Sequence, residues 1–225
     1  MSEKLNNSTV IKNISYDQKE ILYNIMQLHN EGKPFEADMT ASTLGFYKTK
    51  KSDKYVIPEP KILLDVFPQR KDIIKISEYT PLPLEDNSVE SMVCDLPFIV
   101  SPKQSPSVLE DKDGSNLMFK RFHSFYPASD MLAQYKYWIE EIYRVLKPNG
   151  ICVFKTQSTI SGGHNYHTSE WSLCVLLIVD IMCLISLSLM QKHVSSAVRL
   201  RHKNMLVDIL VIFGYLRKMI RKQRK

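Results

Sequence analysis

The stretch "VESMVCDLPFIV" (Val89–Val100) decides the fold: an apolar run stops at an aspartate, a proline and an aromatic ring. Its Val and Met content and the preceding turn signal "EDNS" predict a buried strand of an α/β sheet that ends at Asp95. Ligands of open α/β sheets bind outside the carboxyl ends of the strands, so Asp95 and the loop after it form a candidate site. The alternative is a strand-terminating turn with Phe98 packed in the core, because turn residues cluster at strand ends for backbone reasons.

The residues downstream predict a helix, a turn and a second strand. Ser129 and Asp130 open the helix, apolar residues recur at helical spacing up to Leu146, and "KPNG" (147–150) ends it. The strand "ICVFK" (151–155) follows at once. Strand, helix, strand is the order of a parallel sheet with right-handed crossovers, so we expect an α/β fold with flanking helices.

The residues upstream predict one helix and two further strands. The helix covers residues 15–31, with Ser15 and Gln18 as a capping box and Gly32 at its end. Residues 35–60 are polar and aromatic and predict a long loop, which in compact domains is usually functional. The strands are "KILLDVF" (61–67) and "DIIKIS" (72–77).

Composition places the chain among ordinary globular proteins. Its 225 residues suffice for one substantial core, and 44% of them are hydrophobic and 24% charged. The four cysteines form neither a CxxC pair nor a metal-ligand spacing, which predicts reduced thiols, and "MSEKLNNSTV" lacks the apolar region of a signal peptide. We therefore expect a cytoplasmic protein. The net charge of +6 comes from the tail, where residues 191–225 hold ten basic residues and one acid.

Two segments resemble the core of class I S-adenosylmethionine-dependent methyltransferases, whose sheet is Rossmann-like: "ISEYTPLPLEDNSVESMVCDLPF" (76–98) and "WIEEIYRVLKPNGICVFK" (138–155). Within that class they are most similar to the amino-methyltransferases of DNA that act on adenine or cytosine. "ADMTASTLGFYK" (37–48), "IPEPK" (57–61) and residues 121–157 look like phage and bacterial DNA methylases. The resemblance covers residues 36–170, after an N-terminal helical segment (1–35) and before an atypical tail (171–225).

The resemblance implies methyl transfer to an exocyclic amino group of a DNA base. The family motif is an acidic or amide residue, two prolines and an aromatic, and it stands here as Asp95, Leu96, Pro97 and Phe98. Asp95 and the backbone carbonyl of Leu96 would each accept one amino hydrogen, while Phe98 stacks on the base turned out of the duplex. Leu96 departs from the family, because a proline at this position fixes the φ that aims the carbonyl.

The cofactor implied by the resemblance is S-adenosylmethionine. Its usual site is a Gly-rich turn after the first strand, but no GxG occurs in this chain. By resemblance, Glu78 matches the acid near the adenine ring of the cofactor. The loop 36–60 supplies the other candidates, which are Asp38, Thr40, Gly45, Phe46 and Tyr47. The alternative for this loop is a surface segment with two packed aromatics.

The loop after Phe98 holds the candidate nucleic-acid-binding residues Lys120, Arg121 and Phe125, in a stretch where base-stacking and phosphate-contacting types alternate. A packed aromatic loop is the alternative. His164 and His167 lie near the same end of the sheet, but two histidines without a third ligand are more often hydrogen-bonding loop residues, and we assign no metal.

Two hypotheses account for the tail, and a third, favoured by the missing GxG and by Leu96, concerns the whole chain. "WSLCVLLIVDIMCLISLSLM" (171–190) is long enough to span a bilayer, which predicts a membrane-associated protein whose basic end lies against anionic lipid. The tail also lacks the turn residues that join the closing strands of class I methyltransferases, so a second hypothesis is translation out of frame, with loss of those strands. A third is a nucleic-acid-binding relative of the methyltransferases without catalytic activity.

Overall fold

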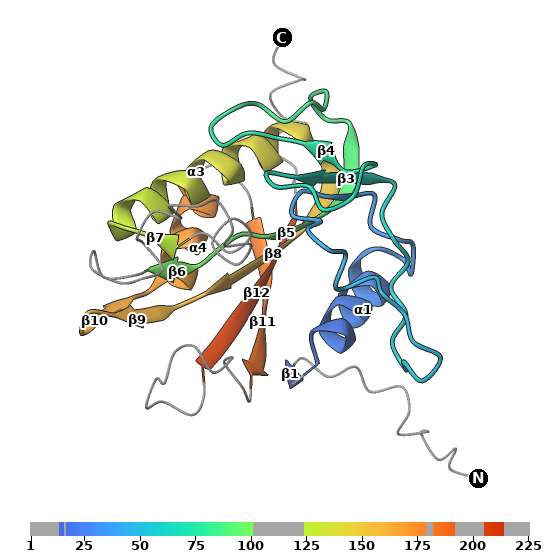
Figure 1. Ribbon diagram of the computed structural model, residues 1–225, viewed down its shortest axis with the longest axis horizontal. Helices are drawn as coiled ribbons and strands as arrows, with labels where there is room; N and C mark the ends of the chain where they lie inside the picture. The colour runs from blue at the N-terminus through green and yellow to red at the C-terminus, as the bar shows by residue number, and fades with distance from the viewer. Residues whose placement is uncertain (1–13, 16, 101–123, 179–181, 192–204, 214–225) are drawn as a thin grey trace.

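The computed structural model describes residues 14–15, 17–100, 124–178, 182–191 and 205–213 (Figure 1). They form three helices and a set of strands. In chain order they are β1 (Ile14–Ser15), α1 (Gln18–His29), β2 (Ala37–Asp38), β3 (Ile62–Asp65), β4 (Ile74–Lys75), β5 (Val89–Asp95), β6 (Ile99–Val100), β7 (Ser124–Phe125), α3 (Ala128–Val145), β8 (Leu146–Gln157), β9 (Thr159–Ser161), β10 (His164–Tyr166), α4 (Thr168–Ile178), β11 (Met182–Gln191) and β12 (Met205–Phe213).

The central sheet has the strand order β1-β11-β12-β8-β5-β2-β3-β4. The strands from β8 to β4 run parallel, and β12 lies antiparallel between β8 and β11. This confirms the predicted α/β class and the strands after Lys61, Asp72 and Ser88. The short strand β2 lies inside the segment predicted to be all loop, and it occupies the middle of the parallel part.

Two apolar layers cover the sheet. Helices α3 and α4 lie on one face and α1 lies on the other (Figure 1). Met92 and Cys94 of β5 pack in the core on the α3 side, whereas Val93 between them packs with α1. Successive side chains of a strand point to opposite faces of the sheet. The same alternation therefore determines on which face each side chain at the end of the strand lies.

Helix α1 begins later than the sequence predicts. Ser15 belongs to β1, and the N-cap is Asp17, whose carboxylate accepts a hydrogen bond from the Lys19 backbone N–H at 2.8 Å. An aspartate at this position satisfies one of the free amides of the first turn, so the capping box at Ser15 is not needed and that prediction is wrong. The helix ends at His29, and Gly32 follows with a φ of +70°.

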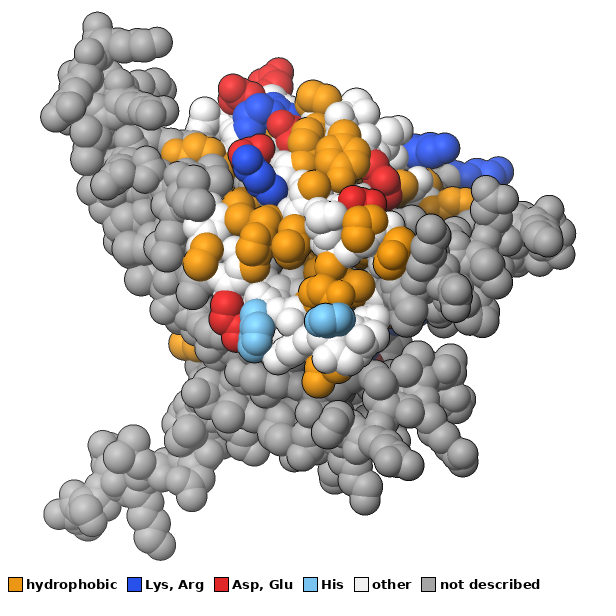
Figure 2. Space-filling view, turned by 90° about the vertical axis from the view of Figure 1, so that its left-hand side faces the viewer, with side chains coloured by type: hydrophobic (Ala, Val, Ile, Leu, Met, Phe, Trp, Pro, Cys, Tyr) orange, Lys and Arg blue, Asp and Glu red, His pale blue; other side chains and the backbone are white. Residues whose placement is uncertain are grey.

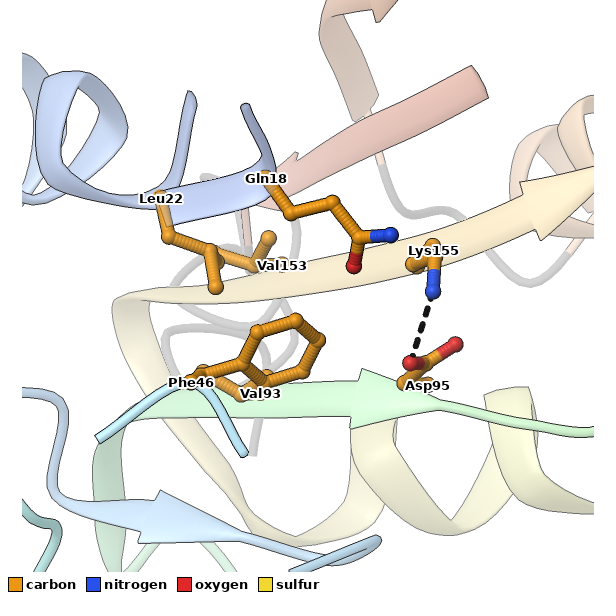
Figure 3. A pocket seen from close by; sticks show the side chains of 7 residues that line it. All are labelled: Gln18, Leu22, Phe46, Val93, Asp95, Val153 and Lys155. Atoms are coloured by element: carbon orange, nitrogen blue, oxygen red, sulfur yellow. Dashed lines mark hydrogen bonds and ion pairs between the residues drawn. The ribbon is translucent and has the colours of Figure 1, made fainter. Parts of the chain in front are cut away.

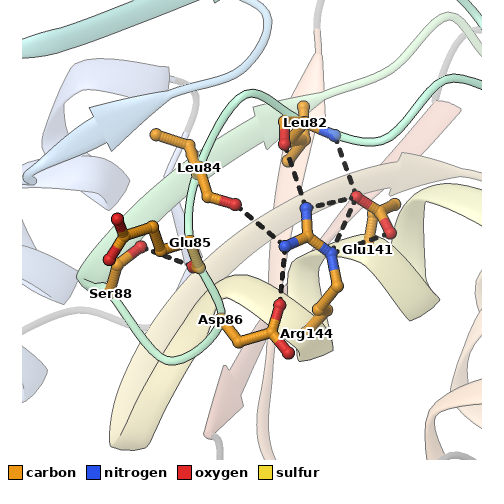
Figure 4. Close-up of polar contacts among 7 residues, drawn as sticks. All are labelled: Leu82, Leu84, Glu85, Asp86, Ser88, Glu141 and Arg144. Atoms are coloured by element: carbon orange, nitrogen blue, oxygen red, sulfur yellow. Dashed lines mark hydrogen bonds and ion pairs between the residues drawn. The ribbon is translucent and has the colours of Figure 1, made fainter.

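An arginine clamp holds the loop that leads into β5 (Figure 4). Arg144 of α3 donates hydrogen bonds to the backbone carbonyls of Leu82 and Leu84, at 3.0 and 2.8 Å, and forms ion pairs with Glu141 and Asp86, both at 2.8 Å. Its planar guanidinium meets these acceptors from several directions, which a lysine cannot do. The clamp therefore fixes where the chain enters β5 and, through that strand, where Asp95 lies.

The C-terminal segment folds as part of the sheet. The apolar run 171–190 is divided between α4 and β11, and no helix in the described part of the chain is long and apolar enough to cross a membrane. The predicted membrane span is therefore wrong, because the run combines a helix with a strand. β11 and β12 occupy the positions of closing strands, so the expected loss of these strands is also wrong. Translation out of frame stays an untested prediction.

Candidate functional site

The candidate site lies where the strand order reverses. From β2 the chain continues to β3 and β4 on one side of the sheet, and then to β5 and β8 on the other. Open α/β sheets bind their ligands in the crevice outside the carboxyl ends of the strands at such a reversal, which here are β2 and β5. Asp38 ends β2 and Asp95 ends β5.

Strand register brings polar residues together on one face. Asp38 pairs in register with Leu63 of β3 and with Val93 of β5, so Asp65 and Asp95, two residues further on, share its face of the sheet. Lys155 of β8 is the register partner of Asp95. Three aspartates and a lysine from four neighbouring strands thus lie near the carboxyl ends of these strands, on the face of the sheet that α1 covers.

Asp38 forms the buried base of this group. Its side chain is 1% exposed, and its carboxylate accepts hydrogen bonds from the Tyr47 hydroxyl at 2.6 Å, the Thr40 backbone N–H at 2.8 Å and the Thr40 hydroxyl at 3.1 Å. Burial raises the pKa of Asp38 to about 6, against the opposing effect of these hydrogen bonds. Asp38 is too buried to meet a ligand directly, so we assign it a supporting role.

Thr40 connects the ends of the two strands. Its hydroxyl oxygen accepts a hydrogen bond from the Asp95 backbone N–H at 2.8 Å while donating to Asp38. A threonine hydroxyl can donate one hydrogen bond and accept another, and both capacities are used here. Thr40 therefore sets the position of the Asp95 backbone relative to β2.

The loop after β2 makes a tight turn without a glycine pair. Ser42 and Leu44 adopt left-handed conformations, with φ of 47° and 60°, that glycine adopts more readily. The Asp65 carboxylate stabilises the turn by accepting hydrogen bonds from the backbone N–H groups of Ser42 and Phe67, both at 2.6 Å. Gly45 is exposed, and a methyl group built on it would meet no atom within 4 Å.

A small pocket of about 250 Å³ opens above this network (Figure 3). Its lining residues come from α1, the loop after β2, β5 and β8: Gln18, Leu22, Phe46, Val93, Asp95, Val153 and Lys155. The Lys155 ammonium forms an ion pair with Asp95 Oδ2 at 2.8 Å. It also lies 5.8 Å from the centre of the Phe46 ring and 5.7 Å from that of Phe98, within the range of cation–π attraction.

The other motif residues follow Asp95 directly. Leu96 is 5% exposed and packs in the core on the α3 side, while Pro97 and Phe98 are partly exposed. The Pro97 carbonyl accepts a hydrogen bond from the Tyr135 hydroxyl of α3 at 3.1 Å. The Phe98 ring is partly exposed and lies beside the Lys155 ammonium, so it is not packed in the core as the simple turn would require.

Glu78 and Phe125 stand apart from the pocket. Glu78 is exposed beyond β4, the strand at the far edge of the sheet. Phe125 is 3% exposed and packs in the core, so its predicted contact with nucleic acid is wrong and the packed aromatic loop is correct for this residue. Lys120 and Arg121 lie outside the described residues.

The surface in Figure 2 carries its basic side chains in small groups near the upper edge and to one side of the described part, with hydrophobic side chains in the middle. The described residues of this face therefore form no continuous basic stripe of the kind that follows a phosphate backbone. His164 and His167 are exposed, and the described residues contain no cluster of metal-ligating side chains.

Sequence reasoning missed Asp65, Lys155 and Gln18 as members of this site. Each had a signal: Asp65 lies in the predicted strand 61–67, Lys155 ends the predicted strand 151–155, and Gln18 lies in the predicted capping box of the first helix. Asp95 and Lys155 both lie an even number of residues from the apolar positions that face α1, so side-chain alternation would have placed them on one face.

A mostly parallel sheet with a reversal of strand order, helices on both faces and one antiparallel strand beside its last parallel strand is now established. The sheet is Rossmann-like.

Solved structures with this fold resemble the chain at low similarity, while no family model and no curated protein matches it. A protein of Thermus thermophilus assigned as a DNA modification methylase, solved with S-adenosyl-L-methionine, is 15% identical, with a TM-score of 0.37 over 58% of this chain and 49% of that one. This chain thus spans about half of that methylase. S-adenosylmethionine-dependent methyltransferases of Leishmania major and Aquifex aeolicus are 11% and 14% identical. The first has a TM-score of 0.41 over 88% of this chain and 78% of its own, and the second 0.38 over 87% and 94%. At these TM-scores, the fold class rests on the strand order.

Proposed function

We propose that the chain is an S-adenosylmethionine-dependent methyltransferase that acts on an exocyclic amino group of a DNA base. The observation that carries this proposal is the position of Asp95: its carboxylate lines a pocket at the point where the strand order reverses, and its partner, the Lys155 ammonium, lies 5.8 Å from the centre of the Phe46 ring and 5.7 Å from that of Phe98. An acceptor with two aromatic rings nearby suits a flat base that carries an amino group.

The residues around the crevice fit the chemistry of the cofactor. S-adenosylmethionine has an ammonium and ribose hydroxyls, which need acceptors, and an adenine ring, which needs a flat apolar surface. Asp65 is partly exposed at the end of β3, and Glu78 is exposed beyond β4. Phe46 supplies a ring, and the open space at Gly45 permits close approach to the backbone. When bound there, the cofactor supplies the methyl group on its sulfonium.

The motif residues would then act on the base. A conjugated amino group is a poor nucleophile, so its lone pair must be drawn out of conjugation. Asp95 would accept one amino hydrogen and the Leu96 carbonyl the other, which directs the lone pair toward the methyl group. Turning the base out of the duplex costs a few kcal/mol, and stacking on Phe98 returns about 1–3 kcal/mol of it.

The inner groups would hold the motif in place. Asp38 supports Thr40, and Thr40 fixes the backbone N–H of Asp95. Lys120 and Arg121 remain the candidates for contact with the DNA phosphates, by the residue types of their loop. In this account the part that binds DNA is separate from the part that accepts the amino hydrogens.

Two observations favour a second candidate function, that of a nucleic-acid-binding relative without methyl transfer. The Asp95 oxygen that would accept an amino hydrogen already pairs with Lys155, and leucine replaces the first proline of the motif. Both features reduce the fit of the motif to an amino group. The two candidates differ in whether the crevice binds the cofactor.

Calorimetric titration of the purified protein with S-adenosylmethionine tests the proposal. We expect the wild type and Asp95→Ala to bind the cofactor with similar affinity, because Asp95 meets the base in this account. Thr40→Ala, which breaks the connection between the two strand ends, should bind it more weakly. Absence of heat in the wild type, whose folding circular dichroism confirms, would refute methyl transfer and leave the second candidate.

A further inference from the structure

Lys155 lines the proposed base pocket beside Asp95. Its side chain is 12% exposed, and its ammonium meets one carboxylate and two aromatic rings that come from β5, the loop after β5 and the loop after β2. A surface lysine could keep its ammonium in water, but here the ammonium points into the pocket (Figure 3). The arrangement matches the recognition of a nitrogen cation by aromatic faces and a counter-charge.

The ammonium lies where the target amino group would have to be. A donor nitrogen bound to a carboxylate oxygen lies about 2.7–3.2 Å away, and Lys155 Nζ lies 2.8 Å from Asp95 Oδ2. A base stacked on Phe98 and bonded to Asp95 would therefore compete with Lys155 for the same place.

We propose that Lys155 is an internal competitor of the base: its ammonium fills the amino-group position between Phe46, Phe98 and Asp95 and leaves when the base enters. This inference rests on the proposed function, because it identifies a base as the ligand. Lys155 thereby keeps the Asp95 carboxylate paired when no base is present. When a base binds, its amino group replaces the Lys155 ammonium as the donor to Asp95. The chain of Lys155 is long enough for its ammonium to move from Asp95 to water without a change in β8.

The test is a fluorescence titration with 2-aminopurine 2′-deoxyriboside, a nucleoside with an exocyclic amino group, in the absence of S-adenosylmethionine. We expect Lys155→Ala to bind this probe about tenfold more tightly than the wild type, because one ion pair and two cation–π contacts no longer compete. Lys147→Ala is the matched control. Lys147 pairs with Glu90 at 2.9 Å outside the pocket, so its removal should leave the affinity unchanged.

Chemical rescue makes the test specific for the ammonium position. The alanine variant lacks the atoms of n-propylammonium, so this ion should refill the space and return probe affinity to the wild-type value, while uncharged 1-propanol should not. Lys155→Met keeps an unbranched stem between the rings, which covers the case in which the alanine variant does not fold. It should bind the probe more tightly than the wild type and be insensitive to n-propylammonium.

Equal or weaker probe binding by both Lys155 variants would overturn the inference and make Lys155 a support of Asp95. Failure of n-propylammonium to compete in a folded Lys155→Ala protein would overturn it as well. Neither result depends on the cofactor. The two proposals can therefore fail separately: the cofactor titration decides methyl transfer, and the nucleoside titration decides the role of Lys155.

Discussion

Replacing Asp38 by asparagine should change how the stability of the protein depends on pH. Asp38 is buried at the end of the central strand, and its pKa is raised from 3.8 to about 6. The folded protein therefore binds this proton more tightly than the unfolded chain does. The free energy of unfolding must then fall as the pH rises from about 4 to about 6, because the folded state is left with a buried charge.

The pKa difference fixes the magnitude. A rise from 3.8 to about 6 corresponds to about 3 kcal/mol between full protonation and full ionisation. About 2 kcal/mol of this falls between about pH 4.5 and about pH 7.5 by the same linkage. Asparagine has the same shape and no charge, so Asp38→Asn should lack this loss. Any cost of reorienting the Tyr47 hydroxyl is the same at each pH and cancels in the comparison.

Urea denaturation at these two pH values measures the effect. We expect the stability of Asp38→Asn relative to the wild type to improve by about 2 kcal/mol from the lower to the higher pH. Asp130→Asn, at an exposed position in the first turn of α3, is the control and should change by less than about 0.5 kcal/mol. A stability difference between Asp38→Asn and the wild type that is the same at both pH values would refute the reasoning.

Three further substitutions test single contacts by urea denaturation. Tyr47→Phe removes the hydroxyl that donates to Asp38 and should destabilise by about 1.5–3 kcal/mol at about pH 7.5; no loss would show that this hydrogen bond is not formed. Arg144→Lys should cost about 1–2 kcal/mol because two backbone carbonyls lose their donor, whereas Arg70→Lys, in an exposed pair, should cost less than about 0.5 kcal/mol; equal losses would contradict the clamp. Gly32→Ala should destabilise by about 1–2 kcal/mol because the φ of Gly32 is +70°, and Gly45→Ala, with open space around it, should not destabilise. A larger loss of stability in Gly45→Ala than in Gly32→Ala would contradict the backbone conformations described for both turns.

Long periodic segments made much of the fold predictable. The apolar run before Asp95 gave β5, and the apolar stripe between Met131 and Val145 gave α3, since both continue long enough to show their period. β2 has only two residues and shows no period. Its place in the sheet depends on β3 and β5 on either side, which local sequence does not encode.

The apolar segment 171–190 misled for a physical reason. A helix that packs on a sheet and a strand inside that sheet are both apolar, so when they follow each other closely the sequence resembles one membrane span. Periodicity cannot separate the two cases within such a run.

The site was predictable in part because the sequence shows where some of its strands end. Asp95 follows directly from the end of β5. Its partner Lys155 lies 60 positions further on and depends on the register of β5 with β8, which pairs the two residues side by side. Asp65 was assigned to a strand, but the turn that it holds lies more than twenty residues earlier in the chain.

Transfer of a labelled methyl group from S-adenosylmethionine to duplex DNA tests the central claim most directly. The account predicts incorporation by the wild type and a loss of about a hundredfold or more in Asp95→Asn, because the variant lacks the charged acceptor for the amino hydrogen. Asp130→Asn, at an exposed residue in the first turn of α3, should retain activity. No incorporation by the folded wild type, or equal incorporation by Asp95→Asn, would contradict it.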